Sequence, residues 1–275
     1  MKLGFNEATC MKRSNVETDL RECEKHGYDF IELRLDMLQD YLTRHTLDDL
    51  KEFFQTRHLK PYALNAIDYL NFQTISGWNE VKRLFLFACE VARAINNPYI
   101  IVCPTRSDEM LFKTEEDTFI DTIHNMRELA DIAMEYGVKL ALEPVGEKNR
   151  CCRSLRQAYE IVQELDMDHV GLTLDCFNFY LHDKCSDIEY IRKIPKEKLF
   201  VFHINDAEDH PLGILEHCHR VMPGDGCIPV KEICNILKEI GYDGIASIEL
   251  FRKEYWNMEP GDVIRIAAHA VKPFL

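Results

Sequence analysis

Residues Val138-Lys-Leu-Ala-Leu-Glu143-Pro144 show how this chain is organised. They follow Gly137, are apolar apart from one lysine, and place a carboxylate immediately before a proline. A short apolar run of this kind is typical of a parallel strand that is buried on both faces. Because proline cannot extend the hydrogen-bonded ladder, we expect the strand to stop at or just after Glu143. An acid then lies at the carboxyl end of a buried strand, where parallel α/β folds hold their functional groups.

Three later segments repeat this arrangement of an apolar run followed by a polar residue. They are Gly171-Leu-Thr-Leu before Asp175, Leu199-Phe-Val-Phe before His203, and Ile245-Ala-Ser-Ile before Glu249. Taken singly, an acid after a strand is often only the N-cap of the next helix, and a lone buried histidine is often structural. Together, however, the four side chains end four successive strands, so we expect them to lie at one rim of the sheet.

Three carboxylates that converge within a few ångströms repel one another by several kcal/mol unless protons or a cation neutralise them. A divalent metal removes that cost, and a lone imidazole completes the ligand set. The sequence therefore predicts one metal site formed by Glu143, Asp175, His203 and Glu249. An oxygen-rich set of this kind suits Zn, Mn, Co, Fe or Mg and does not choose among them.

Strand and helix patterns alternate along the whole chain. We expect strands at residues 3–6, 30–33, 61–65, 98–103, 138–143, 170–174, 199–203 and 245–248. Helix boundaries are marked between them by Ser14-x-x-Glu17 as a capping box, by Gly27 as a left-handed stop, and by caps at Thr46 and Thr114. Eight such units predict a single (β/α)8 TIM barrel domain over residues 1–275. A doubly wound open sheet is the alternative, but no Gly-x-Gly-x-x-Gly follows the first strand.

The composition limits the protein's compartment and partners. Hydrophobic residues make up 46% of the 275, and the balance of 33 basic against 47 acidic residues gives a net charge of −14. Such a surface disfavours non-specific nucleic-acid binding. The chain has eleven cysteines but no Cys-x-x-Cys, and its strand pattern begins at the N-terminus without a signal peptide or a membrane-length apolar window. We therefore expect a cytoplasmic protein with reduced thiols, without membrane or nucleic-acid partners, and with homo-oligomerisation left open.

Longer runs of sequence point to a known family. Phe5-Asn-Glu-Ala-Thr9, Cys23-Glu-Lys-His-Gly-Tyr-Asp29 and Ser247-Ile-Glu-Leu-Phe-Arg252 make the chain resemble the sugar-phosphate isomerase/epimerase superfamily of xylose-isomerase-like barrels. The resemblance covers nearly the whole chain. It implies that the four strand-end residues bind one divalent metal, that Glu143 and Glu249 move a substrate proton, and that Arg252 contacts the substrate.

The resemblance implies an isomerase that shifts a carbonyl between adjacent carbons of a keto-polyol. A divalent metal polarises the ketone and stabilises the enediolate that forms when the neighbouring C–H loses its proton. A glutamate within reach takes that proton and returns it to the adjacent carbon. Burial raises the pKa of such a carboxylate whereas a metal lowers it, and the sequence does not decide between these effects.

Four further positions are candidates for substrate contacts. Asp206, in His203-Ile-Asn-Asp206, is either a contact or a helix cap. Arg220 begins a segment with Pro-Gly-x-Gly that relatives share, and this segment is either a substrate-binding turn or an ordinary loop. Trp78 lies with Tyr69 and Phe72 in an expected loop before a helix at 81–95, where it could stack on a polyol or simply pack. The resemblance predicts Asp-x-x-His after the sixth strand, whereas this chain has Asn178, which can bind a hydroxyl but cannot carry a proton at neutral pH.

Several alternatives remain open at this stage. A keto-sugar epimerase or a dehydratase could use the same enediolate. An apurinic-site endonuclease of the same superfamily needs a three-metal cluster and a basic groove, against which the charge of −14 and the sparse strand-end histidines argue. A non-catalytic sugar-binding barrel does not need both glutamates. The segment His217-Cys218-His219 offers two potential metal ligands, but its polar surroundings predict a surface loop.

Overall fold

Eight parallel strands close into a barrel in this computed structural model, which describes all 275 residues. Around the barrel the strands follow the order β1-β10-β7-β6-β5-β4-β3-β2. Their bounds are β1 Lys2–Asn6, β2 Phe30–Arg34, β3 Lys60–Ile67, β4 Tyr99–Val102, β5 Lys139–Leu142, β6 Val170–Asp175, β7 Leu199–Ile204 and β10 Ile245–Ile248. Pairing between β1 and β10 closes the sheet, with Phe5 opposite Ile248. The predicted (β/α)8 fold is therefore confirmed, and the alternative of an open sheet is wrong.

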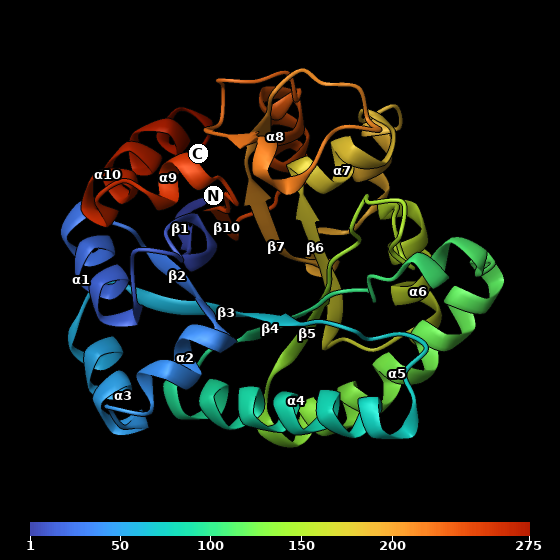
Figure 1. Cartoon of the computed structure of the whole chain (residues 1–275), viewed down its shortest axis with the longest axis horizontal. Coiled ribbons are helices and arrows are strands. Elements are labelled where there is room, and N and C mark those ends of the chain that lie inside the picture. Colours follow the sequence, from blue (N-terminus) through green and yellow to red (C-terminus); the bar gives the residue numbers. More distant parts are fainter.

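The helices lie around the outside of the strands (Figure 1). They are α1 Val16–His26, α2 Leu35–Tyr41, α3 Leu47–Thr56, α4 Ile75–Ile95, α5 Glu115–Tyr136, α6 Leu155–Leu165, α7 Cys176–Asp183, α8 Val230–Glu239, α9 Lys253–Trp256 and α10 Pro260–Val271. Short 3-10 helices span Glu7–Thr9, Asp108–Phe112, Ile188–Lys193, Lys196–Lys198, His217–His219 and Lys272–Phe274. No helix has both the length and the apolarity needed to cross a membrane.

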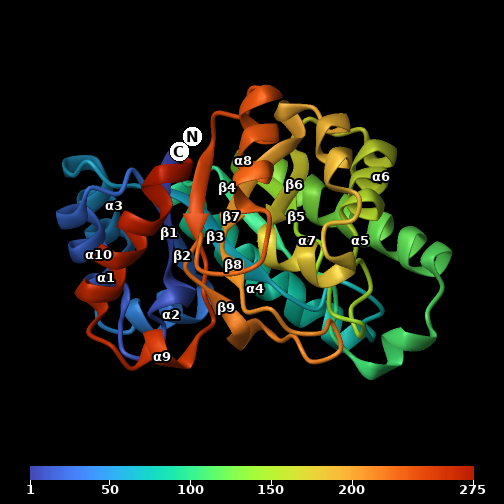
Figure 2. The same cartoon turned by 90° about the horizontal axis from the view of Figure 1, so that it is seen from above.

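A small antiparallel pair lies beyond the end of β7. It is formed by β8 (Asp206–Ala207) and β9 (Arg220–Val221), so the chain leaves the barrel after β7 and returns across its carboxyl end. Figure 2 shows both chain termini near one end of the barrel and β9 and α9 at the other. The segment that contains β8 and β9 therefore lies at the end where the candidate ligands were predicted.

The core has two parts. A cluster of 74 buried residues lies largely between the strands and the helices, and a separate cluster of 8 includes Tyr62, Ile101 and Phe200. The Tyr62 hydroxyl donates a hydrogen bond to the carbonyl oxygen of Phe200 at 3.0 Å. Because β3 and β7 are not neighbours in the sheet, this bond crosses the barrel interior. Aromatic side chains therefore fill part of the barrel, which leaves the polar site at the carboxyl end.

Most of the helix boundaries follow local sequence signals. Thr46 and Thr114 both form complete capping boxes, and Gly27 and Gly137 end their helices at φ 74° and 71°. The capping box predicted at Ser14 is wrong, because Asn15 caps α1 instead.

The helix predicted at 81–95 was also placed too late. It begins at Ile75 behind a cap formed by Thr74, so Trp78 lies in a helix and not in a loop. The sequence signal was present, because threonine is a favoured N-cap residue and Thr74 directly precedes the helix. Its side chain accepts a hydrogen bond from the backbone N–H of Gly77.

Asp19 provides a test of the packing of α1. It is fully buried, its Oδ1 accepts a 2.5 Å hydrogen bond from Ser14, and burial raises its pKa to about 8. Because the folded pKa lies above the ordinary value of 3.8, the folded state binds the extra proton between these two values. The contribution of Asp19 to the free energy of unfolding should therefore fall as the pH rises through that window.

Replacement of Asp19 by asparagine should remove this pH dependence. We expect Asp19→Asn to melt at a higher temperature than the parent at pH 8 and to lose this advantage towards pH 4, as measured by circular dichroism. Asp48→Asn, at an exposed position on α3, is the matched control. Equal differences between variant and parent across this pH range would contradict the raised pKa.

Candidate active site

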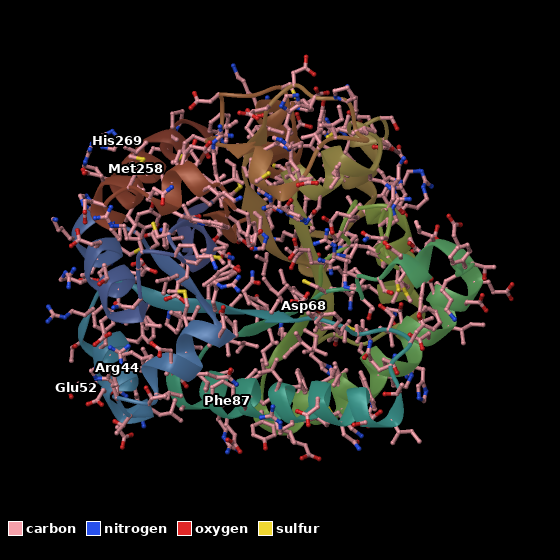
Figure 3. The ribbon with its side chains drawn as sticks, viewed as in Figure 1. Arg44, Glu52, Asp68, Phe87, Met258 and His269 are labelled. Carbon is pink, nitrogen blue, oxygen red and sulfur yellow. The ribbon has the colours of Figure 1, made fainter.

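A cavity of about 610 Å³ opens at the carboxyl end of the barrel. Its polar wall includes Arg34, Asp36, Asn65, Asp68, Arg106, Glu143, Glu147, Arg150, Asn178, Glu216, His217, Arg220, Glu249 and Lys253. Figure 3 labels Asp68, which follows β3 and lies over the middle of the molecule, whereas Arg44 and Met258 lie at its edge. The cavity therefore opens where the predicted ligands end their strands.

The four predicted metal ligands lie together, and two of them, Glu143 and Glu249, line this cavity. Glu143 follows β5, Asp175 ends β6, His203 lies near the end of β7, and Glu249 follows β10. All four side chains are buried, and one ligand atom from each lies within 4.8 Å of the others. The rule that parallel strands present their carboxyl ends at one rim accounts for this convergence.

The orientation of His203 fits a metal ligand. Its Nε2 lies 3.1 Å from Oε2 of Glu32, so the imidazole donates its N–H there and turns Nδ1 towards the three carboxylates. Nδ1 is buried without a hydrogen-bond partner, 3.4 Å from Glu249 Oε2 and 3.7 Å from oxygens of both Glu143 and Asp175. A carboxylate that holds the remote nitrogen of a ligating histidine is the usual arrangement around protein-bound metals. The residues present therefore fit a divalent cation.

Glu32 was missed by sequence reasoning. It was visible as the one charged residue in Phe30-Ile-Glu-Leu33, within an otherwise apolar strand. Because β2 and β7 are not neighbours in the sheet, its contact with His203 crosses the barrel. Only the closed barrel brings these two residues together, so the sequence pattern alone could not predict their contact.

The surroundings give the two glutamates different proton affinities. Burial raises the pKa of Glu143 to about 7, although His203 opposes this shift. Burial also acts on Glu249, but His203 and Arg220 outweigh it and lower the pKa of that carboxyl. For His203, burial is outweighed by Glu32, Glu249 and Glu143, which raise the pKa of the imidazole well above its ordinary value. The three carboxylates around His203 therefore stabilise a positive charge placed between them.

Hydrogen bonds explain why Glu249 remains charged. Its Oε1 accepts from the side-chain amides of Asn6 at 3.1 Å and Asn65 at 3.2 Å, and its Oε2 accepts from Arg220 at 2.8 Å. Glu143 has fewer donors, namely the Asn178 amide at 2.9 Å and the more distant Cys103 thiol at 3.9 Å. Since hydrogen bonds to a carboxylate favour its charged form, Glu249 is the weaker base of the two.

Arg220 is a structural part of this centre. Its Nη1 donates to Asp175 Oδ2 at 3.0 Å as well as to Glu249, and its guanidinium lies 4.9 Å and 5.2 Å from the ring centroids of Phe177 and Phe251. The side chain is fully buried, yet it also borders the cavity. Arg220 therefore holds two of the candidate ligands in place from one side.

Asn178 occupies the position where the resemblance predicts histidine. It borders the cavity and donates to Glu143, while its own backbone N–H donates to Asp175 Oδ1 at 2.6 Å. Asp175 therefore caps α7 with one oxygen and faces His203 with the other. The interpretation of this acid as a helix cap is confirmed, and its second oxygen remains placed as a candidate metal ligand.

The structure corrects the prediction that Asp206 faces the substrate. Its Oδ1 accepts from the backbone N–H groups of Ala207 and Ile228, and its Oδ2 accepts from those of Gly224 and Gly226. A side chain at Gly226 would meet the Ala207 carbonyl oxygen at 2.2 Å, so glycine is required there for this close approach. Asp206 therefore fixes the returning loop and leaves no acceptor free for substrate.

Arg252 and Trp78 also lie away from the cavity lining. Arg252 Nη2 donates to Glu208 at 2.8 Å, and the Trp78 indole N–H donates to Glu128 at 2.8 Å. Both polar groups are thus used in contacts within the protein, and the contacts of these two residues with substrate stay predictions.

His217-Cys218-His219 is not the surface loop that its polarity predicted. His217 and Cys218 line the cavity because the pairing of β8 with β9 carries this segment back across the rim. His219 lies with Glu208 and His210 in a second, half-exposed group of potential ligands. Nδ1 of His219 accepts the Glu216 N–H at 3.0 Å, which places the hydrogen on Nε2 and leaves no free lone pair for a metal.

Comparisons with known proteins agree with this site. The family described as xylose isomerase-like TIM barrel matches residues 20–273. Inosose isomerases from Halalkalibacterium halodurans and Bacillus subtilis are 43% and 42% identical over 268 residues, covering 97% of this chain and 94% and 95% of their own lengths. A crystal structure of the IOLI protein with a bound zinc atom has a TM-score of 0.95 at 41% identity and covers 100% of this chain and 98% of that one. This chain is a member of the xylose isomerase-like TIM barrel family.

Proposed function

We propose that this protein is a metal-dependent isomerase that moves a carbonyl between adjacent carbons of a keto-polyol, as an inosose isomerase does. The observation that carries the proposal is the set of three carboxylates around the unpartnered Nδ1 of His203, two of which, Glu143 and Glu249, line a polar cavity. The identity of 41–43% to four inosose isomerases over 97% of the chain supports the same activity. Both glutamates that could move a proton border the cavity.

The charges of the cavity favour a neutral substrate with many hydroxyls. Arg106 lies 3.4 Å from Glu147, Arg150 lies 3.7 Å from Asp68, and Arg34 lies 3.0 Å from Asp36. Their positive charges are therefore matched by carboxylates within the wall, which disfavours a strongly anionic group such as a phosphate. The same wall offers many donors and acceptors for hydroxyl groups.

Glu143, Asp175, His203 and Glu249 would hold the cation. When bound, a divalent ion polarises the substrate carbonyl and stabilises negative charge on the neighbouring oxygens. Arg220 keeps Asp175 and Glu249 in position, and Glu32 keeps the imidazole turned towards them. The bound zinc of the IOLI crystal structure supports zinc as the first ion to test.

Glu143 is our proposed carrier of the carbon-bound proton. Its carboxylate takes the hydrogen from the carbon beside the carbonyl, and the electron pair of that C–H bond forms the double bond of an enediolate. The proton then returns to the former carbonyl carbon, and the hydroxyl proton of the neighbouring carbon passes to the former carbonyl oxygen, which shifts the carbonyl by one position. Glu249, held by Asn6, Asn65 and Arg220, would act mainly as a fixed negative charge opposite. Asn178 and Arg220 border the cavity and are proposed to contact the substrate oxygens.

We also propose that residues 1–275 act as one domain in the cytoplasm. Strands from the two ends of the chain pair with each other in one barrel, which supports a single unit. The eleven cysteines are all unpaired, which suits a reducing compartment.

Proton NMR of a panel of inososes and keto-hexoses in D2O with the zinc-loaded protein tests this function. We expect deuterium to enter beside the carbonyl and a second ketone to appear at the adjacent carbon. An inverted stereocentre with an unmoved ketone would instead identify an epimerase, and loss of water would identify a dehydratase. Absence of exchange from every substrate would favour a non-catalytic barrel. Nicking of an abasic-site DNA duplex would favour the endonuclease.

A further inference from the structure

Glu147 and His217 form a polar pair on the cavity wall that the proposed mechanism leaves unused. Glu147 lies in the loop after β5, and His217 lies in the segment that returns before β9. His217 Nε2 and Glu147 Oε1 are 3.5 Å apart, which is longer than an ordinary N–H···O hydrogen bond. Both atoms can therefore bind further groups that lie beside them in the cavity.

Arg220 fixes the form of the imidazole. Its Nη2 lies 3.1 Å from His217 Nδ1, and because a guanidinium can only donate, Nδ1 is the acceptor and Nε2 carries the hydrogen. The ring centroids of Phe177 and Phe251 each lie 5.5 Å from that of His217, so the ring is held between two aromatic neighbours. Burial, followed by the charges of Arg220, Arg150 and Arg106, lowers the pKa of His217 well below its ordinary value. His217 is thus a neutral donor that presents one N–H.

Glu147 is the hydrogen-bond acceptor of this pair. Arg150 Nε donates to its Oε2 at 3.2 Å, and Arg106 Nη2 lies 3.4 Å from its Oε1. Both guanidinium groups can only donate, so the carboxylate oxygens of Glu147 are the acceptors in these contacts. The pair therefore consists of one fixed donor beside one fixed acceptor.

We propose that Glu147 and His217 bind two neighbouring hydroxyls of the keto-polyol and determine which polyols the site accepts. The His217 N–H donates to one hydroxyl oxygen, and Glu147 accepts the hydrogen of the hydroxyl on the next carbon. Each hydroxyl can both donate and accept, so a vicinal diol satisfies both partners at once. The inference rests on the proposed function for the class of substrate and extends it to the side chains that select among polyols.

Substrates that lack either hydroxyl should be rejected. A deoxy analogue leaves the N–H or the carboxylate without a partner inside the cavity, and unpaired polar groups are penalised more strongly than a missing apolar contact. A phosphate in place of a hydroxyl should be rejected as well, because the carboxylate repels it.

Binding of myo-inositol, a polyol without a carbonyl, tests the pair without turnover. We expect His217→Phe, which keeps a ring between Phe177 and Phe251, to weaken binding by about tenfold in an NMR titration, and Glu147→Leu to do the same. His217→Gln keeps an amide N–H and should retain most of the parental affinity. His210→Gln is the matched control, because His210 is not among the residues that line the cavity.

The double variant distinguishes a shared ligand from two separate effects. If both side chains bind one diol, His217→Phe with Glu147→Leu should cost less than the product of the two single losses. With a reacting inosose, the single variants should raise KM about tenfold and leave kcat within a few-fold. A merely structural role of His217 would not be rescued by glutamine.

Several results would overturn the inference. One is that either single variant binds myo-inositol with parental affinity. Another is that His217→Phe and His217→Gln lose affinity equally. A third is that the parental protein does not bind myo-inositol. If His217→Phe does not fold, Glu147→Leu alone decides. If the parent binds myo-inositol through this pair but isomerises no keto-polyol, the proposed function fails while the diol site stands.

Discussion

Exchange of the carbon-bound hydrogen should fall by about 10²–10⁴-fold when Glu143 is replaced by glutamine. Glutamine keeps the size of the side chain and one oxygen that can ligate, but it cannot take a proton. Glu143 is the better base of the two glutamates because Asn178 is its main hydrogen-bond donor, whereas three donors hold Glu249 as a carboxylate. Deuterium uptake by the substrate in D2O, followed by NMR, measures the loss directly.

Glu249→Gln is the matched comparison for this experiment. It removes the charge that Arg220 and two asparagines stabilise, so we expect it to disturb metal content and substrate affinity more than exchange per metal-loaded site. Metal content is measured on the same samples by atomic emission. Parental exchange in zinc-loaded Glu143→Gln, together with its loss in zinc-loaded Glu249→Gln, would show that Glu249 is the base.

Replacement of His203 by alanine should remove most of the bound metal and with it the activity. The imidazole supplies the lone pair that faces three carboxylates, and the charge stabilisation provided by a bound metal is worth several kcal/mol in catalysis. We expect zinc retained after dialysis to fall below detection in His203→Ala, while the circular dichroism spectrum remains that of the parent. Asp175→Asn should act in the same direction, but it leaves an oxygen that can still ligate.

Glu32→Gln is a graded control for the metal site. It leaves all four candidate ligands in place and alters only the group that orients His203, so metal affinity should fall by about 10–100-fold without being lost. Competition with a chromophoric chelator measures this change. Full zinc occupancy in His203→Ala, or unchanged affinity in Glu32→Gln, would contradict the assigned orientation of the imidazole.

Residues at strand ends were the most predictable part of this molecule. The predicted strands at 170–174 and 199–203 correspond to β6 at Val170–Asp175 and β7 at Leu199–Ile204. Buried parallel strands are continuous apolar runs, so the first polar residue marks their end and also the position of a functional group. The same rule placed all four candidate ligands at one rim, because the topology leaves no other place for strand ends.

Other elements could not be predicted because their signals are not periodic or not local. Helix α7 (Cys176–Asp183) is buried around most of its surface, so it lacks the polar face that identifies a surface helix. The position of His217 depends on Asp206, whose four backbone hydrogen bonds fold the returning loop over the rim. Sequence reasoning instead left the acid as either a substrate contact or a helix cap, and assigned the histidine to the surface.

The shared position of Arg220 constrains how this barrel could diverge. A single guanidinium contacts two candidate ligands through Nη1 and His217 through Nη2, so a substitution of Arg220 itself would disturb all three neighbours at once. New substrate preferences in descendants of this chain should therefore arise at Glu147 and His217, which reach the cavity from loops outside the barrel strands. The centre that performs the chemistry would then be inherited unchanged while the wall that selects the polyol evolves.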